Sequence, residues 1–281
     1  MPFIHRVCSN QLLPILLLAA VLVFVTTTAR LEKLHRPSVQ AEMQVALPVF
    51  VQIFLAGGDR FLAANTTVFR SLIVSTDNNQ SDRYITQGRL QSDAAWMNPY
   101  HEDNYYLAAA TLPWNGQVDA AQKVLALASN ARPFDMLPPF YYAFNQYYFN
   151  QDPIGGAEWL SIAEQHATEE TNRINLHKLA AKWTEKSQDR AQALKILNIM
   201  AAQSRYRSLK LKILQRAERV RHLMMIDAAI SDYQKQFHKI PENLSALVDS
   251  GHLKRIPDDP LKKGYTIDVQ GKAQPITPPK K

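Results

Sequence analysis

The chain has 281 residues, of which 46% are apolar and 20% are charged, and this composition excludes an intrinsically disordered protein. Its single cysteine, Cys8, excludes an intramolecular disulfide and a cysteine-based zinc site. The net charge of +7 is concentrated near the C-terminus, because residues 205–281 contain 16 lysines and arginines against 8 aspartates and glutamates. The basic character therefore belongs to the last quarter of the chain.

The first predicted element is an uncharged run at 12–29, which follows a short cytoplasmic N-terminus at 1–11. As a helix this run spans about 27 Å, enough for a bilayer core. Thr28-Ala29-Arg30 is a poor cleavage site, so we expect an uncleaved single-pass signal anchor rather than a cleaved signal peptide. Basic flanking residues favour a cytoplasmic bulk, but long C-terminal domains translocate regardless of charge. We therefore expect a bacterial inner-membrane protein with a periplasmic bulk.

Residues 30–93 are predicted to form a helical lead-in. Within it, the apolar run 45–58 is too short to span a membrane and is interrupted by Pro48. It is either a helix lying on the membrane surface or the first buried helix of the following array, continuing through residues 60–62. The polar stretch 76–83 predicts a loop or a helix cap.

Residues 94–204 contain three predicted helix pairs. Their helices are expected at 100–113 and 117–130, at 139–150 and 156–167, and at 172–186 and 189–204. The second helix of each pair begins with a similar sequence segment. Aligning these segments on Ala120, Ala157 and Ala191 gives spacings of 37 and 34 residues. The period of tetratricopeptide repeats is about 34 residues.

On this period and these alanines, residues 98–202 resemble degenerate tetratricopeptide repeats. The resemblance implies a right-handed superhelix with a concave face that binds peptides or protein segments. The expected fold class is therefore mainly α: a tetratricopeptide-like solenoid of helical hairpins, with one N-terminal transmembrane helix and a small C-terminal α+β appendage.

The run 140–149 contains seven aromatic residues in ten positions. A helix that is aromatic on all sides cannot be fully solvated, so it is either a central helix packed on both sides or a groove that grips a peptide or glycan. The candidate partner-binding residues are Tyr141, Phe144, Tyr148, Tyr105 and Trp114.

A long basic helix is predicted at 205–238, with apolar positions spaced by three and four residues up to Phe237. Glu218 is the single acidic residue in its first half. Its basic surface comprises Arg205, Arg207, Lys210, Lys212, Arg216, Arg219 and Arg221. This surface is either an ordinary solvated face or a site for anionic lipid or an acidic partner. Nucleic acid is not expected as a partner, because no recognition motif accompanies the charge.

Residues 239–273 resemble the segment that follows the long helix in type II secretion pseudopilins. The resemblance rests on the order of Ile240-Pro241, Gly251, Ile256-Pro257, Asp259-Pro260 and Gly264-Tyr265. Pro241 is expected to start a short helix, Gly251 to cap it, and Pro257 and Pro260 to fix an extended turn, which explains Asp258-Asp259 through capping and loop geometry rather than through calcium binding. A strand at 265–269 and a turn at 270–271 should follow, and 274–281 should be a frayed tail.

This resemblance implies a small extracytoplasmic docking module. The processing site that precedes the pseudopilin helix is absent from residues 1–10, so polymerisation into a fibre is not implied.

Catalytic motifs are missing from the sequence, and His101-Glu102-Asp103 is interpreted as the polar start of a helix rather than a metal site. We therefore predict no catalytic residues, no metal and no cofactor. The expected function is a membrane-anchored, non-enzymatic scaffold that binds a protein partner in the cell envelope, within a secretion or pilus-like assembly. One alternative is a cytoplasmic-facing adaptor that uses its basic helix on acidic lipid, protein or nucleic acid. A second is an envelope enzyme or glycan- or peptide-binding protein that acts at the aromatic helix. The sequence does not predict an oligomeric state.

Overall fold

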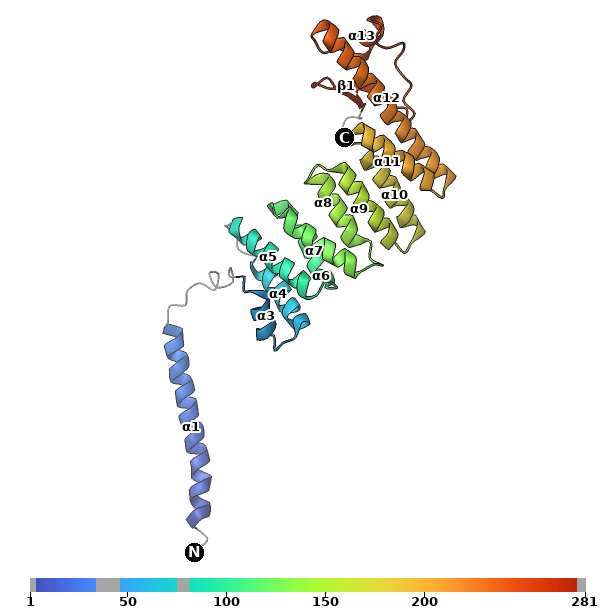
Figure 1. The fold of residues 1–281 in the computed structure, drawn as a ribbon. Coiled ribbons are helices and arrows are strands. Elements are labelled where there is room, and N and C mark those ends of the chain that lie inside the picture. Colours follow the sequence, from blue (N-terminus) through green and yellow to red (C-terminus); the bar gives the residue numbers. More distant parts are fainter. Residues whose placement is uncertain (1–3, 34–45, 75–80, 277–281) are drawn as a thin grey trace. The chain divides into compact units, whose positions relative to one another are not determined.

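The computed structural model describes residues 4–33, 46–74 and 81–276. The chain divides into two compact units, Met1–Ala46 and Leu47–Lys281. It is mainly α-helical, as predicted, and the described residues include one two-stranded sheet near the C-terminus (Figure 1).

The first unit contains the helix α1, Ile4–Lys33, with Pro14 inside it. The described side chains of this helix, at residues 14–30, are all exposed. Within the part of the chain that the structure describes, no helix combines the length and apolar character needed to cross a membrane. The transmembrane helix predicted at 12–29 is therefore not confirmed, and the side chains of Leu12 and Leu13 lie outside the described part.

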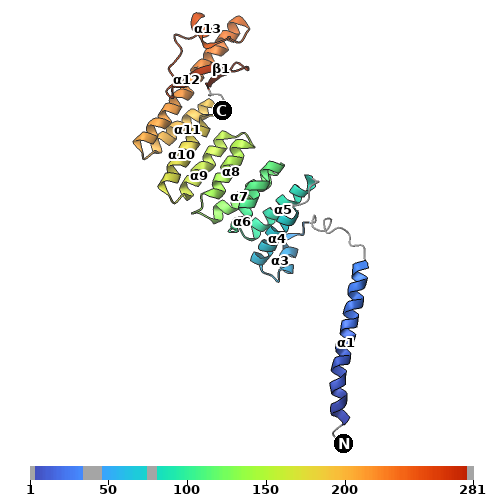
Figure 2. The same ribbon diagram turned by 180° about the vertical axis from the view of Figure 1, so that it is seen from behind.

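The second unit is a row of helices in which most helices pack against their neighbours in sequence (Figure 1; Figure 2). The row comprises α3 (Val49–Leu55), α4 (Arg60–Val74), α5 (Ser81–Met97), α6 (Glu102–Thr111), the 3-10 helix η1 (Pro113–Asn115), α7 (Val118–Ala131), α8 (Leu137–Tyr148), α9 (Pro153–His166), α10 (Glu170–Thr184), α11 (Arg190–Gln203) and α12 (Arg207–Phe237). This arrangement of helical hairpins is compatible with a solenoid.

The three predicted helix pairs are present as α6 and α7, α8 and α9, and α10 and α11. The short polar connections before α9 and α11 act as caps. The carboxylate of Asp152 accepts a hydrogen bond from the Gly155 N–H at 2.9 Å, and that of Asp189 accepts one from the Gln192 N–H at 2.9 Å. Each cap satisfies an N–H that has no partner within its own helix, which fixes where that helix begins.

Small residues allow α8, α9 and α10 to approach closely. A Cβ atom on Gly156 of α9 would lie 3.1 Å from the Ala143 carbonyl oxygen and 3.1 Å from the Trp183 ring. One apolar core runs from α8 through α12, and α11 packs more closely against α12 than against its predicted partner α10. The third predicted pair is therefore looser than the first two.

The N-terminal end of the row differs from the predicted lead-in. The chain turns at Gly57 and Gly58, both with positive φ, so that α3 ends at Leu55 and α4 begins separately at Arg60. The prediction of one helix continuing through residues 60–62 is wrong, because these glycines adopt a left-handed conformation that ends the helix. Of the predicted loop 76–83, residues 76–80 lie outside the described part and 81–83 belong to α5.

The residues after α12 form a C-terminal module, which consists of a short helix and a β-hairpin and packs on the second half of α12. Its core joins Ile226 and Ile230 of α12 to Leu247 of α13 (Leu244–Asp249) and to Tyr265. The short helix does not start at Pro241 as predicted. It begins at Leu244, because the Asn243 side chain accepts a hydrogen bond from the Ala246 N–H at 3.0 Å.

A β-hairpin completes the module. Strand β1 (Tyr265–Ile267) pairs antiparallel with β2 (Ala273–Pro275) through the predicted turn, where Gly271 has a φ of 76°. The Asp268 carboxylate supports this turn by accepting hydrogen bonds from the N–H groups of Gln270 and Lys272. The predicted tail is therefore ordered at its start, because β2 extends to Pro275, while residues 277–281 lie outside the described part.

Candidate partner-binding surfaces

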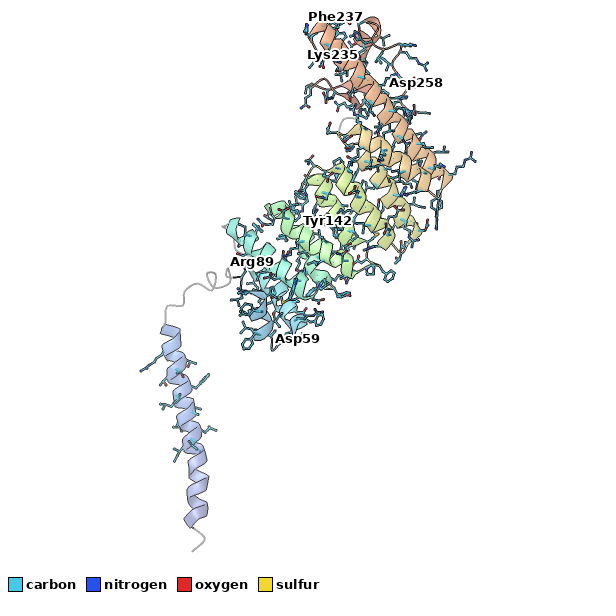
Figure 3. The ribbon with its side chains drawn as sticks, viewed as in Figure 1. Asp59, Arg89, Tyr142, Lys235, Phe237 and Asp258 are labelled. Atoms are coloured by element: carbon cyan, nitrogen blue, oxygen red, sulfur yellow. The ribbon has the colours of Figure 1, made fainter. Side chains whose placement is uncertain are left out.

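The aromatic helix α8 is packed on two sides. Tyr142 (Figure 3) stacks on Trp159 of α9 with 3.6 Å between ring centroids, and Tyr147 stacks on Trp183 of α10 at 4.4 Å. Such stacked pairs stabilise a helix interface beyond their area of burial. These rings support the interpretation of α8 as a central packed helix.

A different set of rings stays accessible at the C-terminal end of α8. We define the aromatic cluster as Trp114, Phe144, Tyr148 and Phe149. Phe144 and Tyr148 are stacked at 5.4 Å, and Trp114 contacts Tyr148 at 5.6 Å and Phe149 at 5.0 Å. Trp114 is 58% exposed and Tyr148 is 49% exposed. Three of the five predicted candidates thus belong to one cluster, although they come from η1 and α8; Trp114 and Tyr148 are exposed, and Phe144 is half-buried beneath Tyr148.

The other two candidates lie away from this cluster. Tyr141 is half-buried and meets Tyr106 edge to face at 6.1 Å. Burial, together with nearby Tyr106 and Asp135, raises the pKa of Tyr141. Tyr105 is fully buried, and its hydroxyl donates a hydrogen bond to Asp135 at 2.7 Å. Tyr105 therefore contributes to the core and presents no atom to a partner.

The Asp135 carboxylate links α6 to the loop before α8. Burial by itself would raise the pKa of Asp135, but hydrogen bonds from Tyr105, the Leu137 N–H and Arg132 lower it below its usual range. Arg132 also pairs with Glu102 at 3.0 Å, so this acidic residue of the His101-Glu102-Asp103 cluster takes part in a structural contact. Among the described residues no group of three or more His, Cys, Asp or Glu side chains is placed to hold a metal ion.

A second accessible surface covers α3 and α4. We define the apolar face as the exposed residues Phe50, Phe54, Leu55, Phe61, Leu62 and Phe69. Helix α3 is buried along one side only, where Val49 and Ile53 pack against Ala63 and Met97. It is therefore neither fully buried nor detached from the row. Exposed apolar surfaces of this kind mark sites of interaction with a protein or a membrane.

The predicted basic surface divides into two groups. Arg207, Lys210, Lys212 and Arg221 of α12, together with Arg205, remain exposed. Arg219 is only 4% exposed and faces inward. Its guanidinium donates two hydrogen bonds to Asp259, at 2.8 and 2.7 Å, and one to Glu185 at 3.0 Å.

Arg216 also pairs with Glu185. The assignment of Arg219 to a basic surface is thus wrong, because its side chain is buried between Glu185 and Asp259, whereas Arg216 is partly exposed and shares Glu185.

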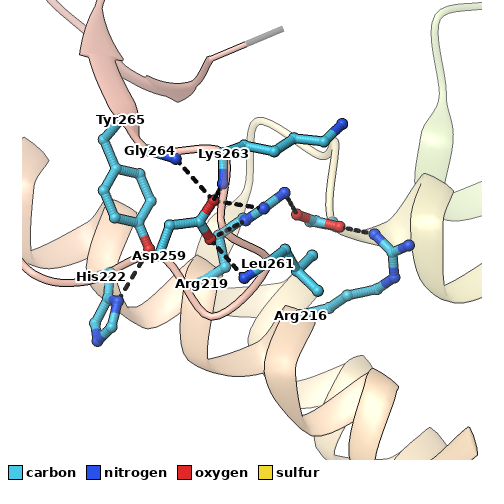
Figure 4. Close-up of polar contacts among 9 residues, drawn as sticks. Arg216, Arg219, His222, Asp259, Leu261, Lys263, Gly264 and Tyr265 are labelled. Atoms are coloured by element: carbon cyan, nitrogen blue, oxygen red, sulfur yellow. Dashed lines mark hydrogen bonds and ion pairs between the residues drawn. The ribbon is translucent and has the colours of Figure 1, made fainter. Parts of the chain in front are cut away.

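Figure 4 shows how Asp259 joins this ion-pair network to the C-terminal turn. Its carboxylate also accepts hydrogen bonds from the N–H groups of Leu261, Lys263 and Gly264 at 3.0, 2.7 and 3.1 Å. Burial would raise the pKa of Asp259, but these bonds and Arg219 lower it. Asp259 thus takes part in the geometry of its turn, as the interpretation of Asp258-Asp259 by capping and loop geometry expects, and Arg219 is the partner that the sequence did not reveal.

A second ion pair attaches the hairpin to the row. Arg190 of α11 pairs with Asp227 of α12 and donates a hydrogen bond to the Ala273 carbonyl oxygen. The Asp227 carboxylate in turn accepts a hydrogen bond from the Ala273 N–H at 2.8 Å. Sequence reasoning missed both residues, because they are 83 and 46 positions from Ala273 and belong to no motif.

No family model matches the chain, and no curated protein or solved structure matches it. The resemblances to tetratricopeptide repeats and to pseudopilins therefore stay predictions. Accessible surfaces, rather than kinship, provide the basis for inferring a function.

Proposed function

We propose that this protein is a membrane-anchored, non-enzymatic scaffold that binds a protein partner in the bacterial cell envelope. The observation that carries this proposal is the aromatic cluster, a connected set of four rings in which Trp114 and Tyr148 are exposed on the row of packed helices. Tryptophan and tyrosine dominate the energetics of protein interfaces, since each buries a large area at a small cost in conformational entropy. The stacking of Phe144 on Tyr148 restricts both rings before a partner arrives.

The membrane part of the proposal rests on α1 and on the apolar face. We place residues 12–29 in the inner membrane as a single-pass anchor, with the remainder of the chain in the periplasm. Thr26 and Thr28 are compatible with an apolar solvent, because their hydroxyls donate to the carbonyls of Leu22 and Phe24 within the same helix, at 2.7 and 2.8 Å. The apolar face of α3 and α4 adds surface that water solvates poorly.

The resemblances add two finer elements to the proposal. Helices α6–α11 act as tetratricopeptide-like repeats that hold a peptide or protein segment. The C-terminal module acts as a pseudopilin-like docking unit, which places the scaffold in a secretion or pilus-like assembly. The order of Pro257, Asp259 and Pro260 before the hairpin supports the second element.

The alternative of a cytoplasmic-facing adaptor is favoured by one observation. Arg205, Arg207, Lys210, Lys212 and Arg221 keep their charges in solvent, where acidic lipid or protein could reach them. A phosphatase fused to the C-terminus separates the alternatives. Phosphatase activity in intact cells supports the periplasmic placement, and its absence, with a stable fusion, supports the adaptor.

The scaffold proposal is tested by replacing the two most exposed rings of the aromatic cluster, Trp114→Ala with Tyr148→Ala. The matched control is Trp96→Ala with Phe134→Ala, two rings that are 60% and 82% exposed elsewhere in the same unit. Each variant is captured from solubilised membranes, and co-purifying proteins are quantified by mass spectrometry. We expect one or more envelope proteins to be lost with the first variant and retained with the control.

Circular dichroism should show that both variants are folded. An identical set of partners for the first variant, the control and the native chain would refute the assignment of the aromatic cluster. Full release of the native chain from membranes by alkaline carbonate would refute the anchor independently.

A further inference from the structure

A cleft of about 580 Å³ lies where the connection between α10 and α11, helix α12 and the β-hairpin meet. Lys182, Lys186 and Ser187 form its wall on the row of helices, and Lys263 and Lys272 form its wall on the C-terminal module. Its volume is within the range of about 300–1,000 Å³ that is usual for ligand sites. The cleft is separate from the aromatic cluster.

The walls of the cleft carry an excess of positive charge. Seven lysine and arginine side chains line it, against two acidic ones, Glu185 and Asp268. Two further carboxylates, Asp227 and Asp259, pair with lining arginines, so seven cations meet four anions and a net charge of +3 remains. The cleft therefore attracts anions, and its walls focus that attraction.

This excess charge resides on accessible lysines. Lys182, Lys263 and Lys272 are exposed, and among the residues that the structure describes they form no ion pair. Arg190 and Arg219, by contrast, have donors committed to Asp227 and Asp259. The arginines thus build the cleft, and the lysines are available to a ligand.

The cleft also has an apolar component. Leu223, Leu261, Ala273, Pro275 and Ile276 line it, and Ile276 is 46% exposed. Leu223 and Ala273 are buried by the protein itself, so an inorganic anion would satisfy the lysines and leave Leu261, Pro275 and Ile276 partly in water. A ligand that carries both carboxylates and apolar groups would satisfy both parts.

We infer that this cleft binds an acidic peptide segment of a partner protein, with carboxylates on the lysines of the rim and an apolar side chain against Leu261 and Ile276. Such a segment would touch the row of helices and the C-terminal module at once. It would therefore couple occupancy of the cleft to the attachment of the module.

The probe is a fluorescein-labelled eight-residue peptide of alternating glutamate and leucine, titrated with the full chain in neutral detergent and followed by anisotropy. Lys263→Glu with Lys272→Glu should weaken binding by about tenfold, because two attractions become repulsions. The control, Lys239→Glu with Lys254→Glu, changes the net charge equally at exposed positions of the same part of the chain that do not line the cleft. It should change the affinity by less than about twofold.

Lys182→Glu tests the opposite wall and should weaken binding by about threefold even if the hairpin variant unfolds. A peptide with lysine in place of glutamate should not bind, and one with serine in place of leucine should bind more weakly. Equal losses in the lysine variants and the control would overturn the inference. So would displacement of the peptide by inorganic pyrophosphate at concentrations as low as those at which the peptide binds, which would identify a simple anion site.

Discussion

Replacing Arg219 by alanine would leave two buried carboxylates without the counter-charge that they share. The side chains of Asp259 and Glu185 are 1% and 7% exposed, and Arg219 bonds to both. In the variant, Arg216 remains beside Glu185, but Asp259 keeps only the N–H groups of its own turn. The variant therefore tests whether a buried ion pair holds the C-terminal module on α12.

The size of the effect follows from burial. Removing one partner of a buried ion pair costs about 3–5 kcal/mol, because the remaining charge has lost both water and its partner. Arg221 provides a matched control on the same helix, since it pairs with Glu218 while being 52% exposed. Exposed pairs contribute about 0–1 kcal/mol, so Arg221→Ala should change stability little.

Urea unfolding of the full chain, followed by circular dichroism, measures the difference in the free energy of unfolding between each variant and the native chain. Adding Asp259→Asn to Arg219→Ala should restore part of the loss, because it removes the buried charge that Arg219→Ala leaves without a cationic partner. Equal stabilities for Arg219→Ala and Arg221→Ala would refute this reasoning and show that the buried network contributes no more than a surface pair.

Two further substitutions, Gly156→Val and Asp259→Asn, should each lower the free energy of unfolding. Gly156→Val should cost about 1–3 kcal/mol in the same assay, since even the first added carbon meets Ala143 and Trp183 at 3.1 Å, and native-like stability would contradict the close packing of α9. The pKa of Asp259 lies below its usual value of 3.8, so its stabilising contribution is complete above that pH and is lost as the pH falls through the lower folded value. Asp259→Asn should thus be less stable than the native chain near neutral pH, with the difference shrinking as the pH falls below 3.8, and a constant difference across urea titrations at each pH would exclude this origin.

The row of helices could be predicted because its signals are local. Alanine spacing identified the three pairs, and the aspartates at 152 and 189 marked helix starts through bonds that span only three residues. Helix α5 was not delimited, because its buried side includes Arg83, Gln87 and Gln91, which a hydropathy pattern assigns to solvent.

The candidate sites were harder to predict because they depend on contacts between distant residues. Trp114, Phe144 and Tyr148 were named for their residue types, and the fold brings them together, whereas Tyr105 has the same chemistry and turns inward to Asp135. Arg219 belongs to a run of charges that predicts a basic face. Its partners are 34 and 40 positions away, so no local pattern could show that it is buried.

The bond between Ala273 and the Arg190–Asp227 pair has a consequence for the edge of the small sheet. The Asp227 carboxylate accepts a hydrogen bond from the Ala273 N–H, and the Arg190 guanidinium donates one to the Ala273 carbonyl oxygen. The main chain of a third strand would make the same two bonds. Pro275, the last residue of β2, has no N–H to offer. An edge strand with free main-chain groups is a template for unwanted pairing with other molecules. Here two side chains replace the missing neighbour at Ala273, so neither Ala273 nor Pro275 offers a free N–H to another strand at this edge.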